Sequence, residues 1–282
     1  MNTNHNCKEA VAKIQKLNPS VAVYAQAHKL ISSPDIQLEQ LADIIKLDTA
    51  LTANIIRLSN SAGLGGTMPT VSLLVAMNRV GLGEVKRYLG LSVSRSLLYR
   101  NLKYYLISAY DYWSSSVSMA ILMELLSQRI KEDKNDAYTV GILHATGRLV
   151  INQILDNLEN SIYWDKKMPI EKWEMDSVGL TYSTAGTLLL KAWGFPPSLC
   201  DIIENQLSPE RMSNPSTMLK ALNFGIRFLP STGVEFTIEK WKFPDSDPFL
   251  KEFDISPDEL QKIVLETKQK HAEAQASLLI SN

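Results

Sequence analysis

The chain has 282 residues, of which 45% are hydrophobic and 21% charged, a balance typical of a folded globular protein and unlike that of a disordered one. This length predicts one large domain or two closely packed subdomains. The formal net charge is -1, from 29 basic and 30 acidic residues, so no overall field attracts nucleic acid or an anionic membrane.

Apolar residues at helical spacing predict the first elements, after a polar N-terminal segment over residues 1–16. A helix is expected over residues 21–30, and Ser32–Asp35 reads as a turn. The next helix covers residues 38–45. Asp48 is placed to cap a third helix. Short helices joined by tight turns are typical of a helical bundle.

The glycine-rich stretch of residues 60–70 superficially resembles a phosphate-binding loop, but it lacks the Lys-Ser/Thr pair that follows in a P-loop. A glycine-rich exit from a helix is the favoured interpretation. Helices are then expected over residues 71–79 and 82–99, separated at Gly81.

Long helical patterns follow over residues 104–130 and 137–158. Gly141 and Gly147 lie inside the second pattern, where they indicate close approach of another helix. Ser114–Ser116 are interpreted as residues at the start of a helix.

The last third of the chain continues in the same way. A helix is expected over residues 180–193 with Gly194 as its stop, and Pro196–Pro197 begins another. Further helices are expected over residues 216–228 and, after a capping box with proline, 257–279. Residues 234–238 alternate in polarity, which fits a short strand or a buried extended loop and leaves the overall prediction all-α.

The segment most informative about function is Gly141–Leu149, which reads Gly-Ile-Leu-His-Ala-Thr-Gly-Arg-Leu. It resembles the Gly-Leu-Leu-His-Asp-Ile-Gly-Lys signature of HD-superfamily phosphohydrolases, in which neighbouring His and Asp residues help to hold a metal that activates water. Ala145 stands at the aspartate position.

Three other stretches narrow the resemblance to the HDOD branch of that superfamily, the HD-related output domains of bacterial signalling proteins. These are residues 38–62, the run Ala-Met-Asn-Arg-Val-Gly at 76–81, and residues 185–196, where Phe195 replaces the family's leucine. The resemblance covers residues 17–206. It implies an all-α, multi-helix HDOD-like domain of two packed helical subdomains, an N-terminal bundle over about 17–103 and an HD-like part over 104–206. Residues 207–282 are expected to form a helical extension that packs on the domain.

The resemblance also locates the metal ligands that an active HD site requires. They fall near Ser115, at Ala145, near Tyr182 and, for a His-His pair, at about 205–206, where the chain has Asn-Gln. His144 lacks its aspartate neighbour, and one imidazole does not make a divalent-metal site. No metal, no cofactor and no catalytic residue are therefore predicted.

Other chemistries leave no pattern in the sequence. There is no Gly-x-Ser-x-Gly elbow, neither cysteine has a nearby histidine, and His5, His28 and His271 lie far apart. His144 itself is interpreted as a buried or half-buried helix histidine bonded to the backbone or to a nearby side chain, in preference to a metal ligand.

Two groups of residues remain candidates for binding. Trp113, Ser115, His144, Ala145 and Tyr182 are expected to outline a vestigial pocket, and for Trp113 core packing is the favoured alternative. Arg57, Ser59 and Asn60 are the polar members of a matching motif. They are candidates for partner contact, although a helix-end hydrogen-bond network that bridges the subdomains is the favoured alternative.

The resulting hypothesis is a non-catalytic regulatory module that binds a protein or a small signalling ligand. The resemblance implies a response regulator, a kinase or a cyclic-dinucleotide enzyme as partner, acting in trans, while nucleic acid and membranes are not expected. Pairing of two copies through the helix at 257–279 is left open. The alternative is a divergent metal-dependent phosphohydrolase acting on a nucleotide or phospho-signal.

Cysteine usage and the N-terminus predict the compartment. Cys7 and Cys200 lie far apart without a C-x-x-C spacing, so neither a disulfide framework nor a zinc ribbon is indicated. Residues 1–10 lack an apolar signal core, and no apolar run reaches the length of a membrane span. A cytoplasmic location is expected.

Overall fold

The computed structural model describes residues 3–17, 19–31, 36–60, 69–93, 97–158, 162–229 and 247–280. Within these ranges the chain is helical, with turns and one isolated bridge between Leu102 and Ile107 but no β-strand. The predicted all-α class is therefore confirmed. The glycines of the 60–70 stretch and the alternating residues 234–238 lie outside the described residues.

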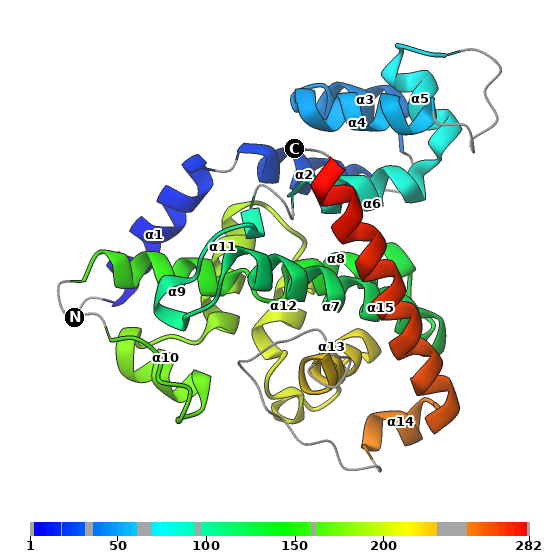
Figure 1. Cartoon of the computed structure of the whole chain (residues 1–282). Coiled ribbons are helices and arrows are strands. Elements are labelled where there is room, and N and C mark those ends of the chain that lie inside the picture. Colours follow the sequence, from blue (N-terminus) through cyan, green and yellow to red (C-terminus); the bar gives the residue numbers. More distant parts are fainter. Residues whose placement is uncertain are drawn as a thin grey trace.

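The N-terminal part of the fold contains six helices (Figure 1). They are α1 (Thr3–Leu17), α2 (Pro19–Ile31), α3 (Leu38–Ile45), α4 (Thr49–Ser59), α5 (Leu73–Val80) and α6 (Leu82–Val93). Asp48 caps α4 as predicted, because its side chain accepts a hydrogen bond from the Leu51 amide. Helices α3, α4 and α5 form a group that stands apart from the main body, and α2 and α6 lie between the two (Figure 1).

The main body is built around the long helix α7 (Ala109–Ile130). The other helices up to residue 205 are α8 (Lys134–Leu143), α9 (Gly147–Asp156), α10 (Ile170–Val178), α11 (Tyr182–Ala192) and α12 (Pro197–Asn205). Helix α7 packs along α8, and α9 packs against α11. Fifteen residues of α7 are buried, on all its faces, so this helix forms the centre of the core.

The predicted close approach at the two glycines of α8 and α9 is confirmed. A Cβ on Gly141 would lie 2.6 Å from the Ala120 Cα, and one on Gly147 would lie 1.8 Å from the Tyr182 carbonyl oxygen. Both distances are too short for any side chain. Glycine at these positions lets α8 contact α7, and α9 contact α11, backbone to backbone.

Several predicted boundaries were wrong. The helix expected from residue 104 begins at Ala109, because Ser108 caps it and Leu106 adopts a left-handed conformation after a short 3-10 turn, η2 (Lys103–Tyr105). Ser114–Ser116 consequently lie inside the helix rather than at its start. The helix expected from 137 to 158 breaks at residues 144–146, and α6, in the range expected to be helical from 82 to 99, is described as far as Val93.

The N-terminal segment also differs from the expectation. No helix was predicted before residue 17, yet α1 begins at Thr3 and buries Cys7, Ala10 and Ile14. Its apolar residues recur at three- and four-residue spacing, but the many polar residues on its other face made this pattern hard to recognise in the sequence. Helix α1 packs against α9 and α11, so this segment is part of the folded core.

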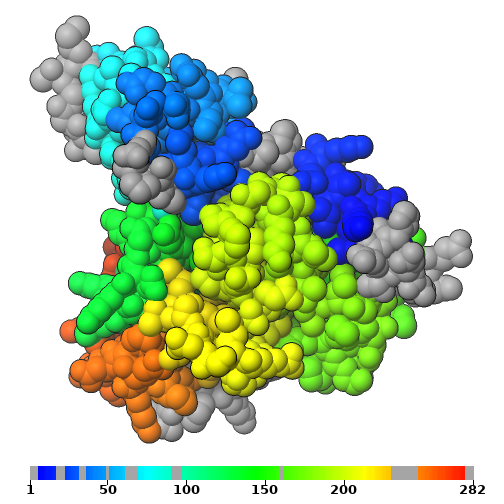
Figure 2. All heavy atoms as spheres, turned by 180° about the vertical axis from the view of Figure 1, so that it is seen from behind, coloured from blue at the N-terminus to red at the C-terminus, as the bar shows by residue number. Residues whose placement is uncertain are grey.

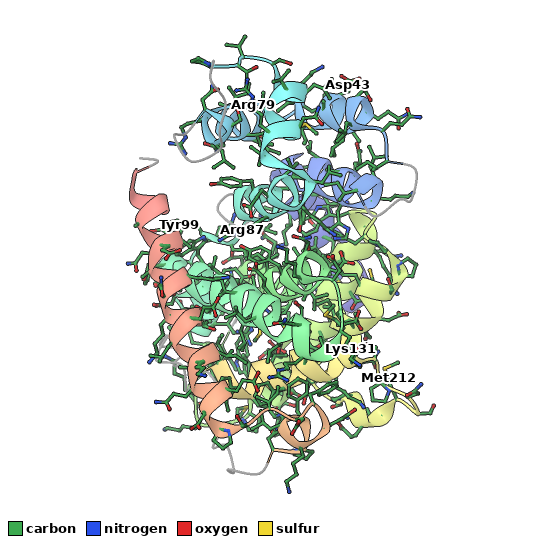
Figure 3. The ribbon with its side chains drawn as sticks, turned by 90° about the vertical axis from the view of Figure 1, so that its right-hand side faces the viewer. Asp43, Arg79, Arg87, Tyr99, Lys131 and Met212 are labelled. Carbon is green, nitrogen blue, oxygen red and sulfur yellow. The ribbon has the colours of Figure 1, made fainter. Side chains whose placement is uncertain are left out.

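The C-terminal part packs on the main body. It consists of η3 (Pro209–Arg211), α13 (Thr217–Phe228), α14 (Pro248–Glu252) and α15 (Pro257–Ile280). The Phe224 and Phe249 rings stack with centroids 4.5 Å apart, which ties α14 to α13. Helix α15 runs along α7, on the left in Figure 3. None of the described helices is both long and apolar enough to span a bilayer.

Candidate functional site

The five residues predicted to outline the pocket lie in the interior of the main body. Trp113, Ser115, His144, Ala145 and Tyr182, here called the His144 centre, are each at most 3% exposed. They come from α7, from the turn between α8 and α9, and from the first turn of α11. The centre is thus a buried part of the core.

His144 ends α8 and is bonded to the backbone, as predicted. Its Nδ1 lies 2.7 Å from the Gly141 carbonyl oxygen, and since a carbonyl only accepts, Nδ1 carries the proton. Burial, together with the nearby Arg148 charge, lowers the pKa of His144 to about 3. The imidazole is therefore neutral over the physiological pH range.

Ser115 and Ala145 are linked through the side chain and backbone of Tyr112. The Ser115 hydroxyl donates to the Tyr112 carbonyl at 2.7 Å, and the Tyr112 hydroxyl donates to the Ala145 carbonyl at 3.0 Å. Serine and alanine at these two positions supply no imidazole or carboxylate. The hydrogen bond from Tyr112 to Ala145 instead links α7 to the turn that follows α8.

Tyr182 is covered by a buried arginine. The guanidinium carbon of Arg148 lies 4.5 Å from the centre of the Tyr182 ring, and Arg148 is only 2% exposed, a cation-π arrangement. Glu174, fully buried on α10, accepts hydrogen bonds at 2.8 Å from the Tyr182 amide and from the Tyr105 hydroxyl. The charges of Arg148 and Glu174 act in opposite directions on the pKa of Tyr105, which burial raises. Both charges therefore lie near that hydroxyl.

Gln206 closes the centre from the α12 side. Its side-chain Nε2 donates to the His144 carbonyl at 2.9 Å, its backbone carbonyl accepts from Asn223 Nδ2 at 2.8 Å, and it is fully buried. A glutamine amide therefore stands where the resemblance places one member of a histidine pair. It connects the end of α8 to α13.

Helix α15 brings a second histidine next to the His144 centre, which the sequence did not indicate. The Nε2 of His271 lies 2.8 Å from the Ser114 hydroxyl, and its ring centroid is 6.0 Å from that of Trp113. Ile263, Thr267 and His271 are all buried. Their four-residue spacing is typical of one face of a helix, but it was not recognised as a buried face because Thr267 and His271 are polar.

The residues of the His144 centre do not fit the metal of an active HD site. Ser115, Ala145, Tyr182 and Gln206 stand where the sequence resemblance puts four of the ligands, and His144 keeps one lone pair on Nε2. In the part of the chain that the structure describes, no three His, Cys, Asp or Glu side chains are grouped in a way that would hold a metal ion. No catalytic step follows from this donor set.

The second candidate group, at the end of α4, has local hydrogen bonds. The Asn60 side chain donates to the Thr70 carbonyl at 2.8 Å and accepts from the Thr70 amide at 2.9 Å. The buried Ser59 hydroxyl donates to the Ile56 carbonyl, and the exposed Arg57 donates to Asn54 at 3.3 Å. These bonds link α4 to the start of α5, so the network is a helix-end one within the α3–α5 group.

Comparison with known proteins places this architecture in a family. The model of the HDOD domain matches residues 17–209. The chain belongs to the HDOD family. The four motifs quoted from the sequence all lie inside the matched range, and the HDOD region ends just after Gln206. No curated protein sequence matches the chain significantly.

Solved structures share the fold of this HDOD protein at low sequence identity. An HDOD domain protein of unknown function from Geobacter sulfurreducens is 19% identical, with a TM-score of 0.61 over 91% of this chain and 88% of that one. A "Putative metal-dependent phosphohydrolase" from Shewanella amazonensis SB2B is 18% identical, with a TM-score of 0.58 over 97% and 99%. A "Putative signal transduction protein" from Marinobacter aquaeolei VT8 is 18% identical, with a TM-score of 0.70 over 98% of this chain and 64% of that one.

Proposed function

We propose that this HDOD protein is a non-catalytic regulatory module of bacterial signal transduction that acts by binding a protein or a small signalling ligand. The observation that carries the proposal is the content of the His144 centre. Where the sequence resemblance puts the HD ligands, the chain has Ser115, Ala145, Tyr182 and Gln206, and the Ser115, Tyr112 and Gln206 side chains donate hydrogen bonds to backbone carbonyls. A retained fold without its ligands is suited to binding rather than to hydrolysis.

The proposed partner is a response regulator, a kinase or a cyclic-dinucleotide enzyme, acting in trans. Support comes from the HDOD family itself and from the name of the Marinobacter neighbour. The near-neutral net charge argues against nucleic acid. Pairing of two copies through α15 would have to use its outer side, where Leu265 is exposed, because the side containing Ile263 and His271 is buried.

The alternative is a divergent phosphohydrolase, which the name of the Shewanella neighbour favours. Such an enzyme would have to bind metal with carboxylates outside the HD ligand positions. The fully buried Glu174 is a carboxylate beside the centre, but it already accepts two hydrogen bonds, from Tyr105 and Tyr182.

The test is the metal content of the intact chain, expressed with added manganese and iron and purified without a metal-affinity tag. Plasma mass spectrometry is expected to find transition metal well below one ion per chain, unchanged in His144→Asn. A content near one or two ions per chain that falls in His144→Asn would contradict the proposal. His271→Asn is the matched control, because it changes a buried histidine outside the HD ligand positions.

A further inference from the structure

A hollow of about 510 Å³ opens between α2, α8, α12 and α13, a volume in the range of sites that bind small ligands or anchoring side chains. Figure 2 shows the yellow surface of the α12–α13 region next to green surface from the middle of the chain. The lining of the hollow is largely apolar and includes Val140, Leu199, Ile202, Met212, Met218 and Leu219. We call it the acidic hollow, for the reason that follows.

Three carboxylates lie among the lining residues of the acidic hollow: Glu132, Asp136 and Asp201. The largely buried ammonium of Lys86 pairs with Asp136. Among the described residues, Glu132 and Asp201 have no basic partner, and both are exposed. The Glu132 carboxylate accepts a hydrogen bond from the Thr217 hydroxyl, which leaves its charge in place. The hollow therefore combines an apolar lining with net negative charge.

We infer that the acidic hollow is the docking site for a partner-protein segment in which an apolar side chain is flanked by lysine or arginine. The apolar side chain enters between Leu199, Ile202 and Met218, where its burial supplies most of the affinity. The flanking cations face Glu132 and Asp201, which fix orientation and speed association. This inference rests on the proposed function, since it names the surface that binds the partner.

The same charges argue against a second kind of ligand. A cyclic dinucleotide or a nucleotide brings phosphate anions, which would lie against Glu132 and Asp201. Like charges brought together at a partly desolvated site repel each other and weaken binding. No lysine or arginine is among the described residues that line the hollow, and Lys86 beside it is already paired with Asp136. The lining His28 is neutral near pH 7, because burial lowers its pKa to about 4. Charge complementarity therefore favours a basic peptide segment over a phosphorylated small molecule.

The experiment selects dodecapeptides from a random phage-displayed library on the full-length chain and measures the affinity of the selected peptides by fluorescence anisotropy. Asp201→Lys is the test variant, and Asp43→Lys is the matched control, because both change an exposed helical aspartate. Asp43 lies in the α3–α5 group, at the opposite end of Figure 3 from Lys131 and Met212. Ile202→Gln tests the apolar contact separately.

Selected peptides are expected to carry an apolar residue flanked by lysine or arginine. Asp201→Lys should weaken their binding at least about tenfold, Ile202→Gln should also weaken it, and Asp43→Lys should leave it unchanged. Peptides that bind wild type and Asp201→Lys equally would overturn the docking assignment but leave the binding function standing. Acidic peptides, or none at all, would also overturn it. Failure of the proposed function shows separately, as bound metal in the content measurement.

Discussion

The His144 centre and the acidic hollow occupy opposite ends of the same two helices. Asp136 and Val140 of α8 line the hollow, and the same helix ends at His144. Leu199 and Ile202 of α12 line it too, and α12 ends at Gln206. From Asp136 to His144 the rise along α8 is about 12 Å. A segment bound in the hollow would therefore contact helices that lead directly to the centre.

The difference between the two ends lies in how their polar groups are used. At the centre, the hydrogen-bond donors of Ser115, Tyr112, His144 and Gln206 are buried and bonded to backbone carbonyls within the protein. At the hollow, carboxylates of Glu132 and Asp201 remain exposed beside apolar side chains. Groups already bonded internally serve stability, whereas exposed charges beside an apolar recess serve recognition. Substitutions at the two ends should consequently have opposite consequences for stability and binding.

The largest effect is expected from Gly147→Ala, which places a methyl group against the Tyr182 carbonyl oxygen. The backbones of α9 and α11 would have to separate, and we expect a loss of about 3 kcal/mol or more in the free energy of unfolding. Urea denaturation measures it. Gly83→Ala is the control, because a Cβ there meets nothing closer than 3.9 Å. Equal stabilities for the two variants would refute the close contact.

Glu174→Ala should follow, with a loss of about 2–3 kcal/mol. It removes the acceptor for the buried Tyr105 hydroxyl and the Tyr182 amide, and unpaired buried donors are costly. The control on the same helix is Asp176→Ala, whose exposed pair with Lys172 is worth about 0.5 kcal/mol or less. If both variants unfold at the same urea concentration, Glu174 does not hold the centre together.

The pH dependence of stability tests the burial of His144. Its folded pKa of about 3 lies below the ordinary value of 6.5, so the unfolded chain binds the extra proton first as pH falls. The stability of the fold therefore suffers no loss from this histidine above about pH 6.5, and falls progressively as the pH is lowered toward 3. When the pH is lowered from 7 to 5, the free energy of unfolding of His144→Asn should fall by about 2 kcal/mol less than that of wild type. Parallel curves for the two proteins would mean that this imidazole is solvated.

The smallest effect on stability is expected at the acidic hollow. Asp201→Asn removes an exposed charge that has no ion-pair partner among the described residues, so the free energy of unfolding should change by less than about 0.5 kcal/mol. The same variant should weaken binding of the selected basic peptides. A large loss of stability here would show that Asp201 is a structural residue and that the two ends do not differ as described.

The sequence was sufficient for the fold class, because helical periodicity is a local pattern, and it placed the changed HD ligands only through a resemblance of short motifs. Helical periodicity marks α7, and Gly141–Arg148 form one contiguous motif. The helix break at residues 144–146 was missed, because it follows from the contact of Gly147 with α11, which no local pattern encodes. Helix α1 was missed because its apolar stripe is narrow.

The residues that pack around the His144 centre could not be predicted from the sequence. Glu174 and His271 reach it from α10 and α15, and their contacts with Tyr182 and Ser114 span eight and 157 positions of the chain. Polar residues in such positions look like solvent-facing ones in the sequence. The acidic hollow likewise combines residues of four helices. Long-range packing of this kind appears only when the chain is folded.

The most direct test of the account is the thermal midpoint of the intact protein with manganese added and with metal chelated. A ligand that binds only the folded state raises the midpoint. If the His144 centre is closed by its own side chains, millimolar manganese should leave the midpoint of wild type and of His144→Asn equally unchanged. A rise of several degrees in wild type that disappears in His144→Asn would show a working metal site and contradict the account.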